Sequence, residues 1–174
     1  MPGIEIVSEP LAVPYFDGVV VDRDIYIDHH QEPSPEQAAQ ALAAFARLTP
    51  ADRLADSLHV YNYYRDFHQD VGGEEWLDEE MGVPATPEEI WQHVTPGTVH
   101  LVIDPRHPDH VYVVMSANCV WEEEHGLMMI WEDGARLTKV GGYDGHVTNE
   151  TAYDRPEYKG IVYKANDPAL TTRL

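Results

Sequence analysis

The sequence predicts a single α+β domain, residues 1–174, in which an antiparallel β-sheet arranged as a meander packs against an αα-hairpin. Three observations support this fold class. The apolar pattern changes from a period of two to a helical period and then back to two. Two helical starts carry capping residues. The chain is 43% hydrophobic and long enough to bury a core without disulfides or metal. A parallel βαβ arrangement is not expected.

Two strands and then two amphipathic helices open the chain. Residues 4–7 and 19–28 are rich in β-branched residues and bounded by Pro and Gly, which is typical of strands. The first helix begins at Ser34, with Pro35 at its first position and Gln37 as capping-box partner. The second begins in the same way at Thr49. We expect the two helices to form the αα-hairpin, over about residues 34–71. The predicted apolar stripes comprise Ala38, Leu42, Phe45 and Leu48 in the first helix, and Leu54, Leu58, Val60, Tyr61, Tyr64, Phe67 and Val71 in the second.

Strands dominate the second half of the prediction. The run "EEWLDEEMG" favours a short helical turn, and Thr86 with Glu89 indicates a third capped helix start. Tyr63, on the other face of the second helix, is a candidate exposed anchor. The expected strands are "TVHLVI", "VYVVMSANCVW", "LMMIW", "ARLTKV" and "IVYK".

The pair Asp133-Gly134 fixes the expected register of the last hairpin, because Asp-Gly is favoured in two-residue type I′ turns. This turn would pair Glu132 with Ala135 and Leu127 with Val140. Both faces of the hairpin are apolar, so both are expected to be covered at least in part. One face would hold Leu127, Met129, Trp131 and Val140, and the other Met128, Ile130 and Leu137.

The same register brings two polar loops together. "EEEHG" precedes the hairpin and "GGYDGH" follows it, so both leave the same end of the sheet, while "DPRHPDH" lies at the opposite end. We expect Glu123 to point away from the patch, since neighbouring side chains on extended backbone alternate. We also expect His125 to reach Asp144 or His146, directly or through one water or ion, and substitutions at His125 and Asp144 to be coupled. The candidate binding patch is Glu122, Glu124, His125, Asp144 and His146.

Imidazoles and carboxylates suit a divalent metal, for which the candidate ligands are His125, Asp144 and His146; no other cofactor is expected. They also suit general acid–base chemistry. The spacing matches no metal signature such as HExxH, and a solvated loop with structural histidines is the competing interpretation. We expect Cys119 to be buried and inert, and no catalytic residue is assigned.

The charge constrains the partners. Asp and Glu number 31 against 11 Lys and Arg, giving a formal net charge of −20. Such a field repels nucleic acids and anionic membranes and attracts basic proteins. No signal peptide and no membrane-spanning run is visible, so we expect a cytoplasmic protein.

The stretch "CVWEEEHGLMMIWEDGARLTKVGGYDGH" resembles a family of uncharacterised bacterial domains with a C-x-W-x-x-E-H-G-L run and a D-G-H ending. The resemblance implies a small α+β domain without established activity, and several such families are associated with toxin immunity. The first functional hypothesis is therefore a non-enzymatic acidic binding protein, of inhibitor or immunity type, with a basic partner. The alternatives are a metal-binding protein or metal-dependent enzyme using residues 122–146, and a structural subunit.

Overall fold

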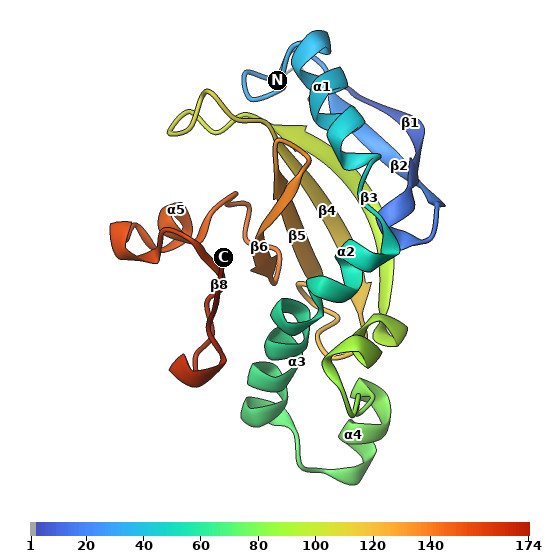
Figure 1. Ribbon diagram of the computed structural model, residues 1–174, viewed down its shortest axis with the longest axis vertical. Coiled ribbons are helices and arrows are strands. Elements are labelled where there is room, and N and C mark those ends of the chain that lie inside the picture. Colours follow the sequence, from blue (N-terminus) through green and yellow to red (C-terminus); the bar gives the residue numbers. More distant parts are fainter. Residues whose placement is uncertain (1–2) are drawn as a thin grey trace.

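A computed structural model describes residues 3–174 and shows mixed α+β architecture (Figure 1). The main sheet has six strands in the spatial order β1-β2-β3-β4-β5-β6, and β7 pairs with β8 in a second, two-stranded sheet. The strands are β1 (Ile6–Val13), β2 (Val19–Tyr26), β3 (Val94–Val102), β4 (Tyr112–Cys119), β5 (Leu127–Glu132), β6 (Arg136–Gly141), β7 (Ile161–Tyr163) and β8 (Thr172–Arg173).

One pair of neighbouring strands in the main sheet is parallel. β2 and β3 run in the same direction, with Arg23 beside Val99 and Asp24 beside His100, whereas every other neighbouring pair is antiparallel. The expectation of a wholly antiparallel sheet without a βαβ arrangement is therefore wrong at this pair. The helical segment between the two strands runs along the sheet and returns the chain to the end where β2 begins, so the next strand must be parallel.

The helices cover one face of the main sheet. In place of a two-helix hairpin, three helices follow one another along that face from residue 35 to residue 71 (Figure 1). The capping box of Ser34 and Gln37 is confirmed by reciprocal hydrogen bonds. The segment after Thr86 forms a 3₁₀ helix without a side-chain cap, and Glu89 accepts a hydrogen bond from the backbone N–H of Ala85 rather than of Thr86. The elements are α1 (Pro35–Phe45), α2 (Pro50–Ala55), α3 (Ser57–Val71), α4 (Glu75–Met81) and the 3₁₀ helix η2 (Pro87–His93).

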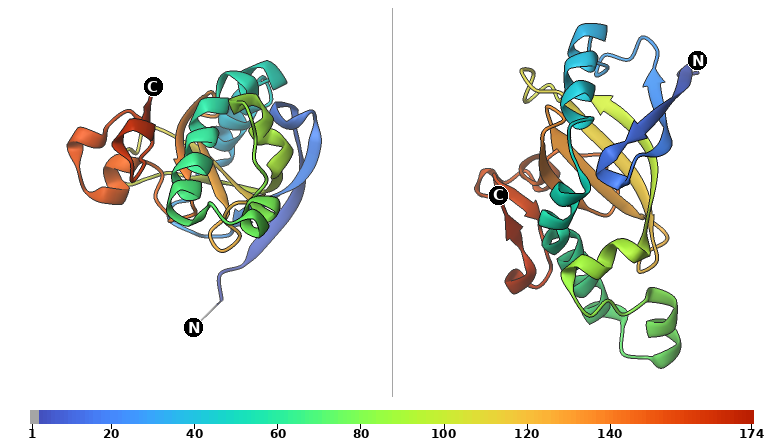
Figure 2. Two further views of the ribbon diagram at one scale, coloured as in Figure 1. Left: turned by 90° about the horizontal axis from the view of Figure 1, so that it is seen from below. Right: turned by 45° about the vertical axis from the view of Figure 1, so that its right-hand side comes forward.

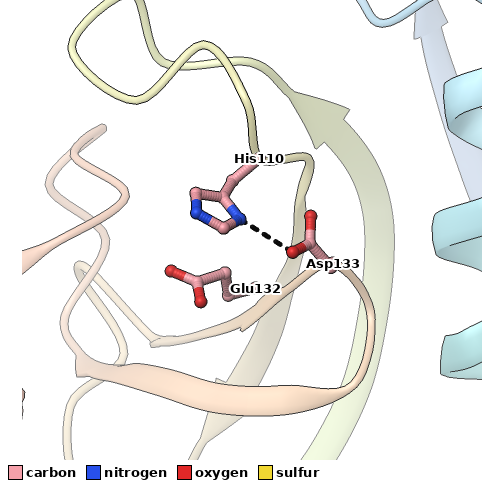
Figure 3. Close-up of side chains that lie close together, drawn as sticks. All are labelled: His110, Glu132 and Asp133. Atoms are coloured by element: carbon pink, nitrogen blue, oxygen red, sulfur yellow. Dashed lines mark hydrogen bonds and ion pairs between the residues drawn. The ribbon is translucent and has the colours of Figure 1, made fainter.

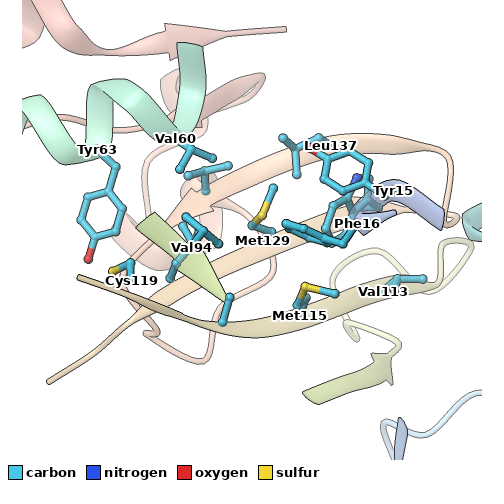
Figure 4. Packing of buried hydrophobic residues seen from close by; sticks show 14 of the residues in the cluster. Tyr15, Phe16, Val60, Tyr63, Val94, Val113, Met115, Cys119, Met129 and Leu137 are labelled. Atoms are coloured by element: carbon cyan, nitrogen blue, oxygen red, sulfur yellow. The ribbon is translucent and has the colours of Figure 1, made fainter. Parts of the chain in front are cut away.

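The break at Asp56 between α2 and α3 changes which side chains reach the core. Leu54 and Leu58, expected in an apolar stripe, are half-exposed. Tyr63, the candidate exposed anchor, is 6% exposed and packs in the core (Figure 4). The predicted stripe requires one helical period to continue through residue 56, but α2 ends at Ala55 and a new helix begins at Ser57.

The register of the β5–β6 hairpin differs from the prediction. Glu132 pairs with Arg136 and Ile130 pairs with Lys139, and the pairing shifts by one residue between Ile130 and Trp131. Thr138 is thus an extra residue in β6, a β-bulge. Nearer the turn, Ala135 is left unpaired between Glu132 and Arg136, so Leu137 pairs with Trp131 and lies in the helix-side core rather than on the opposite face.

Apolar clusters lie on both faces of the sheet, as expected. The larger joins the helices to residues such as Met115, Met129 and Leu137 (Figure 4). The smaller, on the opposite face, is made of Tyr112, Val114, Met128, Ile130 and Val147.

The C-terminal segment is attached to α3 and β6. The buried carboxylate of Asp66 accepts hydrogen bonds from the Tyr163 hydroxyl and from the backbone of Asn166 and Asp167. This segment holds α5 (Asn149–Tyr153), η3 (Pro156–Tyr158) and η4 (Pro168–Leu170) besides β7 and β8. Within residues 3–174, no helix combines the length and the apolarity that crossing a membrane requires.

Candidate functional site

The two polar loops that flank the β5–β6 hairpin lie side by side, as the sequence predicts. The backbone N–H of Tyr143 donates to the carbonyl oxygen of His125 at 3.2 Å. The observed register of the hairpin differs from the predicted one, but both loops leave the same end of β5 and β6 in either register. The prediction that the loops lie side by side is therefore confirmed.

The carboxylate of Glu122 closes the first loop on itself. It accepts hydrogen bonds from the backbone N–H of Glu124 at 2.8 Å and of His125 at 3.0 Å, and it lies 3.1 Å from Nδ1 of His125. The hydroxyl of Tyr63 donates to the carbonyl oxygen of Gly126 and lies 3.5 Å from the Glu122 carboxylate. Glu122 is buried, so its first role is to hold the loop against α3.

Glu122, Glu124 and His125 form the part of the predicted patch that the structure brings together. Each offers one ligand atom within 4.8 Å of the others. Glu124 and His125 are exposed, and Glu123 is outside this group, as expected. The loop is a turn rather than extended strand, so this arrangement follows from the bonds of Glu122 and not from strand alternation.

Asp144 and His146 belong to a different network. Nζ of Lys139 donates to the two carboxylate oxygens of Asp144 at 2.6 and 2.7 Å, and to the carbonyl oxygen of His146 at 2.9 Å. Lys139 is 2% exposed, and burial lowers the pKa of its ammonium group. Across residues 3–174, no hydrogen bond or ion pair joins His125 to Asp144 or His146. The buried lysine, which the sequence analysis did not use, holds Asp144 away from His125.

Cys119 is buried, as expected. Burial raises the pKa of its thiol to about 12, and Sγ donates to the carbonyl oxygen of Glu122 at 3.3 Å. A thiol with such a high pKa is almost entirely protonated at neutral pH and is a poor nucleophile.

The opposite end of the sheet holds a second group of possible metal ligands, His110, Glu132 and Asp133 (Figure 3). This places "DPRHPDH" and the Asp133 turn together, as predicted. Nδ1 of His110 lies 2.7 Å from Asp133, and this hydrogen bond raises the pKa of the imidazole. The other carboxylate oxygen of Asp133 accepts from the backbone N–H of Val111 at 3.0 Å. Both bonds join the β5–β6 turn to the start of β4.

A further candidate surface, on α4, was missed by the sequence analysis. Trp76 is 60% exposed there, although large aromatic side chains are usually well buried. Met81 and a 2.7 Å hydrogen bond between His68 and Asp78 anchor the other side of this helix. The helix projects from one end of the molecule (Figure 2). We define the α4 surface as the exposed residues Glu74, Glu75, Trp76, Glu79 and Glu80. The run "EEWLDEE", a tryptophan between acidic residues, is the signal that identifies it.

Comparisons with known proteins give one match. No curated protein and no solved structure matches the chain. A family model described as a domain of unknown function (DUF6985) matches residues 3–147, which is most of the chain and includes both polar loops and the α4 surface. The chain therefore belongs to the family of domains of unknown function DUF6985.

Proposed function

We propose that this protein is a non-enzymatic binding protein that recognises a basic protein partner through the α4 surface. The observation that supports the proposal is the exposed indole of Trp76, which lies on a projecting helix among exposed glutamates. The finer form of the proposal is a bacterial inhibitor or immunity-type protein that acts in the cytoplasm, with neither nucleic acid nor membrane as its partner.

The chemistry of the α4 surface suits a partner rich in arginine or lysine. Tryptophan is enriched among the residues that dominate binding energy at protein interfaces, and its ring attracts cations through the face. The flanking carboxylates add charge complementarity, and the net charge of −20 accelerates the approach of a basic partner. The side of α4 that carries Met81 and Asp78 is already engaged, so the helix presents its other side without rearrangement.

The test measures binding of a fluorescently labelled oligoarginine peptide by anisotropy at low salt. Trp76→Ala, and separately the double substitution Glu79→Lys with Glu80→Lys, should each weaken binding about tenfold or more, which is about 1.4 kcal/mol. The tryptophan emission of the wild-type protein should also change on binding, because Trp76 is far more exposed than Trp121 or Trp131.

The matched control changes the same charge elsewhere. Glu5→Lys with Asp22→Lys alters exposed residues of the β1–β2 region and also raises the net charge by four. This variant should weaken binding about twofold or less, through the loss of long-range attraction alone. Equal losses in the two double variants would show that the attraction is diffuse, and an unchanged affinity in Trp76→Ala would remove the α4 surface from the proposal.

A divalent metal in the first polar loop is the second candidate function, favoured by the proximity of Glu122, Glu124 and His125. Asp144 is not a member of this ligand set, because it is bonded to Lys139. Calorimetric titration with Zn²⁺ should show a stoichiometric site that His125→Ala abolishes. Titration heat that persists in His125→Ala would contradict this assignment.

A further inference from the structure

A pocket of about 370 Å³ lies on the face of the main sheet opposite the helices. Its floor is apolar and consists of Val114, Met128 and Ile130 from adjacent strands. The loop after β2 borders it and is fixed by a 2.7 Å hydrogen bond from the N–H of Ile103 to the carbonyl oxygen of Gln31. The volume falls in the range of about 300–1,000 Å³ that is typical of small-molecule sites.

Flat rings line the sides of the pocket. Tyr26 and His100 meet edge to face, with ring centroids 5.7 Å apart and planes at 78°. His29 also lies beside Tyr26, at a centroid distance of 6.1 Å. Tyr143 and His146, from the second polar loop, complete the aromatic lining. His146, predicted to face His125, thus contributes to a different site.

Burial shifts the pKa values of three lining groups, and the carboxylate of Asp104, which also lines the pocket, accepts a hydrogen bond from the backbone N–H of Arg106 at 2.9 Å. Burial lowers the pKa of His100 and raises the pKa of Tyr26 and of Glu32, and each shift disfavours the charged form. Arg106, which carries a permanent charge, has a side chain that is 60% exposed and an ion pair with Asp154 at 3.8 Å. Its charge is therefore largely screened by solvent and does not select for an anion.

We propose that this pocket binds a small, uncharged, planar aromatic or heteroaromatic molecule, stacked among the rings of Tyr26, His100 and Tyr143 over the apolar floor. Aromatic rings favour stacked and edge-to-face contacts with other rings. Neutral imidazole and phenol groups donate and accept hydrogen bonds, which suits the ring nitrogens and exocyclic groups of a heterocycle. The pocket does not involve the α4 surface, and this inference is independent of the function proposed there.

The chain contains an internal reporter for this site. Met128 lies in the pocket floor, whereas its neighbour Met129 belongs to the helix-side core. In protein labelled with ¹³C at the methionine methyl groups, indole and adenine serve as planar neutral probes. Benzoate serves as a planar anion and cyclohexanol as a neutral non-planar molecule. Indole or adenine should change the chemical shift of the Met128 methyl group in a saturable way, with a Kd of about 1 mM or below, and should leave the chemical shift of Met129 unchanged.

The other outcomes contradict the proposal. Failure of both planar neutral probes to move Met128, or equal movement of Met129, would exclude specific binding in the pocket. Tighter binding of benzoate would show an anion site, and equal binding of cyclohexanol would show an apolar cavity without preference for rings.

Two substitutions of Tyr26 distinguish the effect of losing the aromatic ring from the effect of disturbing the fold. Tyr26→Leu should weaken indole binding about tenfold, and Tyr26→Phe should retain it within about twofold, since only the first substitution removes the ring. Unchanged binding in Tyr26→Leu would contradict the stacking role. If Tyr26→Leu does not fold, the probe series on the wild-type protein still decides the matter.

Discussion

At the residue scale, single buried polar side chains determine how the loops around the sheet are arranged. Glu122 and Lys139 lie near the same end of the β5–β6 hairpin but bond different partners. Glu122 bonds the backbone of its own loop, and Lys139 bonds Asp144 of the other loop. Two loops that touch through their backbones therefore carry separate side-chain networks.

We predict that Glu122→Ala lowers the free energy of unfolding by about 2–3 kcal/mol. The substitution removes a buried charged acceptor and leaves two backbone N–H groups without their partner. The control is Glu124→Ala, an exposed neighbour, which should cost less than about 0.5 kcal/mol. Urea denaturation measures both, and similar losses in the two variants would contradict the structural role of Glu122.

We predict that His125→Ala and Asp144→Ala have additive effects on stability, within about 0.5 kcal/mol in a double-mutant cycle. This revises the expectation of coupling drawn from the sequence, because Asp144 is bonded to Lys139 rather than to His125. The reference cycle pairs Asp144→Ala with Lys139→Met, for which the coupling energy should exceed about 1 kcal/mol. A coupling energy well above about 0.5 kcal/mol between His125 and Asp144 would contradict this prediction and would support the single patch expected from the sequence.

At the element scale, the β5–β6 turn and helix α1 approach each other closely. Gly134 has φ of +71°, and a Cβ there would overlap the backbone carbonyl oxygen of Ala41. Gly134→Ala should therefore destabilise the protein by more than about 3 kcal/mol, combining left-handed strain with a backbone clash. Gly145→Ala is the matched control, since its φ is +75° and no atom is near; it should cost about 1–2 kcal/mol. Thermal unfolding of both variants tests this, and equal shifts in Tm would count against the close approach.

The junction between α2 and α3 contains a carboxyl group that responds to pH. Burial raises the pKa of Asp56 from 3.8 to about 6, opposed by the hydrogen bond that the Tyr15 hydroxyl donates. Between pH 4 and pH 6 the folded protein retains this proton while the unfolded chain loses it. Stability contributed by the neutral form is therefore present at pH 4 and is lost as the pH rises to about 6.

We predict that the stability of the wild-type protein falls relative to Asp56→Asn across this interval, as measured by denaturation at several pH values. The difference between the two proteins isolates Asp56 from the many other carboxylates. A constant difference would show that Asp56 ionises normally in the folded protein.

At the scale of the whole molecule, the net charge of −20 disfavours the compact state through self-repulsion. Raising NaCl from about 0.01 M to about 0.15 M shortens the screening length from about 30 Å to about 8 Å. We predict that Tm rises over this range, and that it rises less in Glu79→Lys with Glu80→Lys, whose net charge is −16 after two changes of two units each. A Tm that falls with added salt would show that favourable ion pairs outweigh the repulsion.

The sequence by itself determined several of the elements and the neighbourhood of the two polar loops. The local bonds of Ser34 and Gln37, the apolar runs of β4 and β5, and the turn at Asp133-Gly134 depend on residues close in the chain. Loops that flank one hairpin share an end of the sheet even when the register shifts, which is why their contact was predicted correctly.

Only the tertiary structure decided which side chains meet. The bulge at Thr138, the break at Asp56 and the parallel β2–β3 pair each depend on packing between distant segments. Lys139 is buried because Asp144 and the carbonyl of His146 satisfy its ammonium group, and that choice of partners divides the predicted patch between two side-chain networks. A sequence pattern shows which residues are polar. The partner that a buried charge takes is set by the free energy of burying that charge, and this free energy depends on the whole fold.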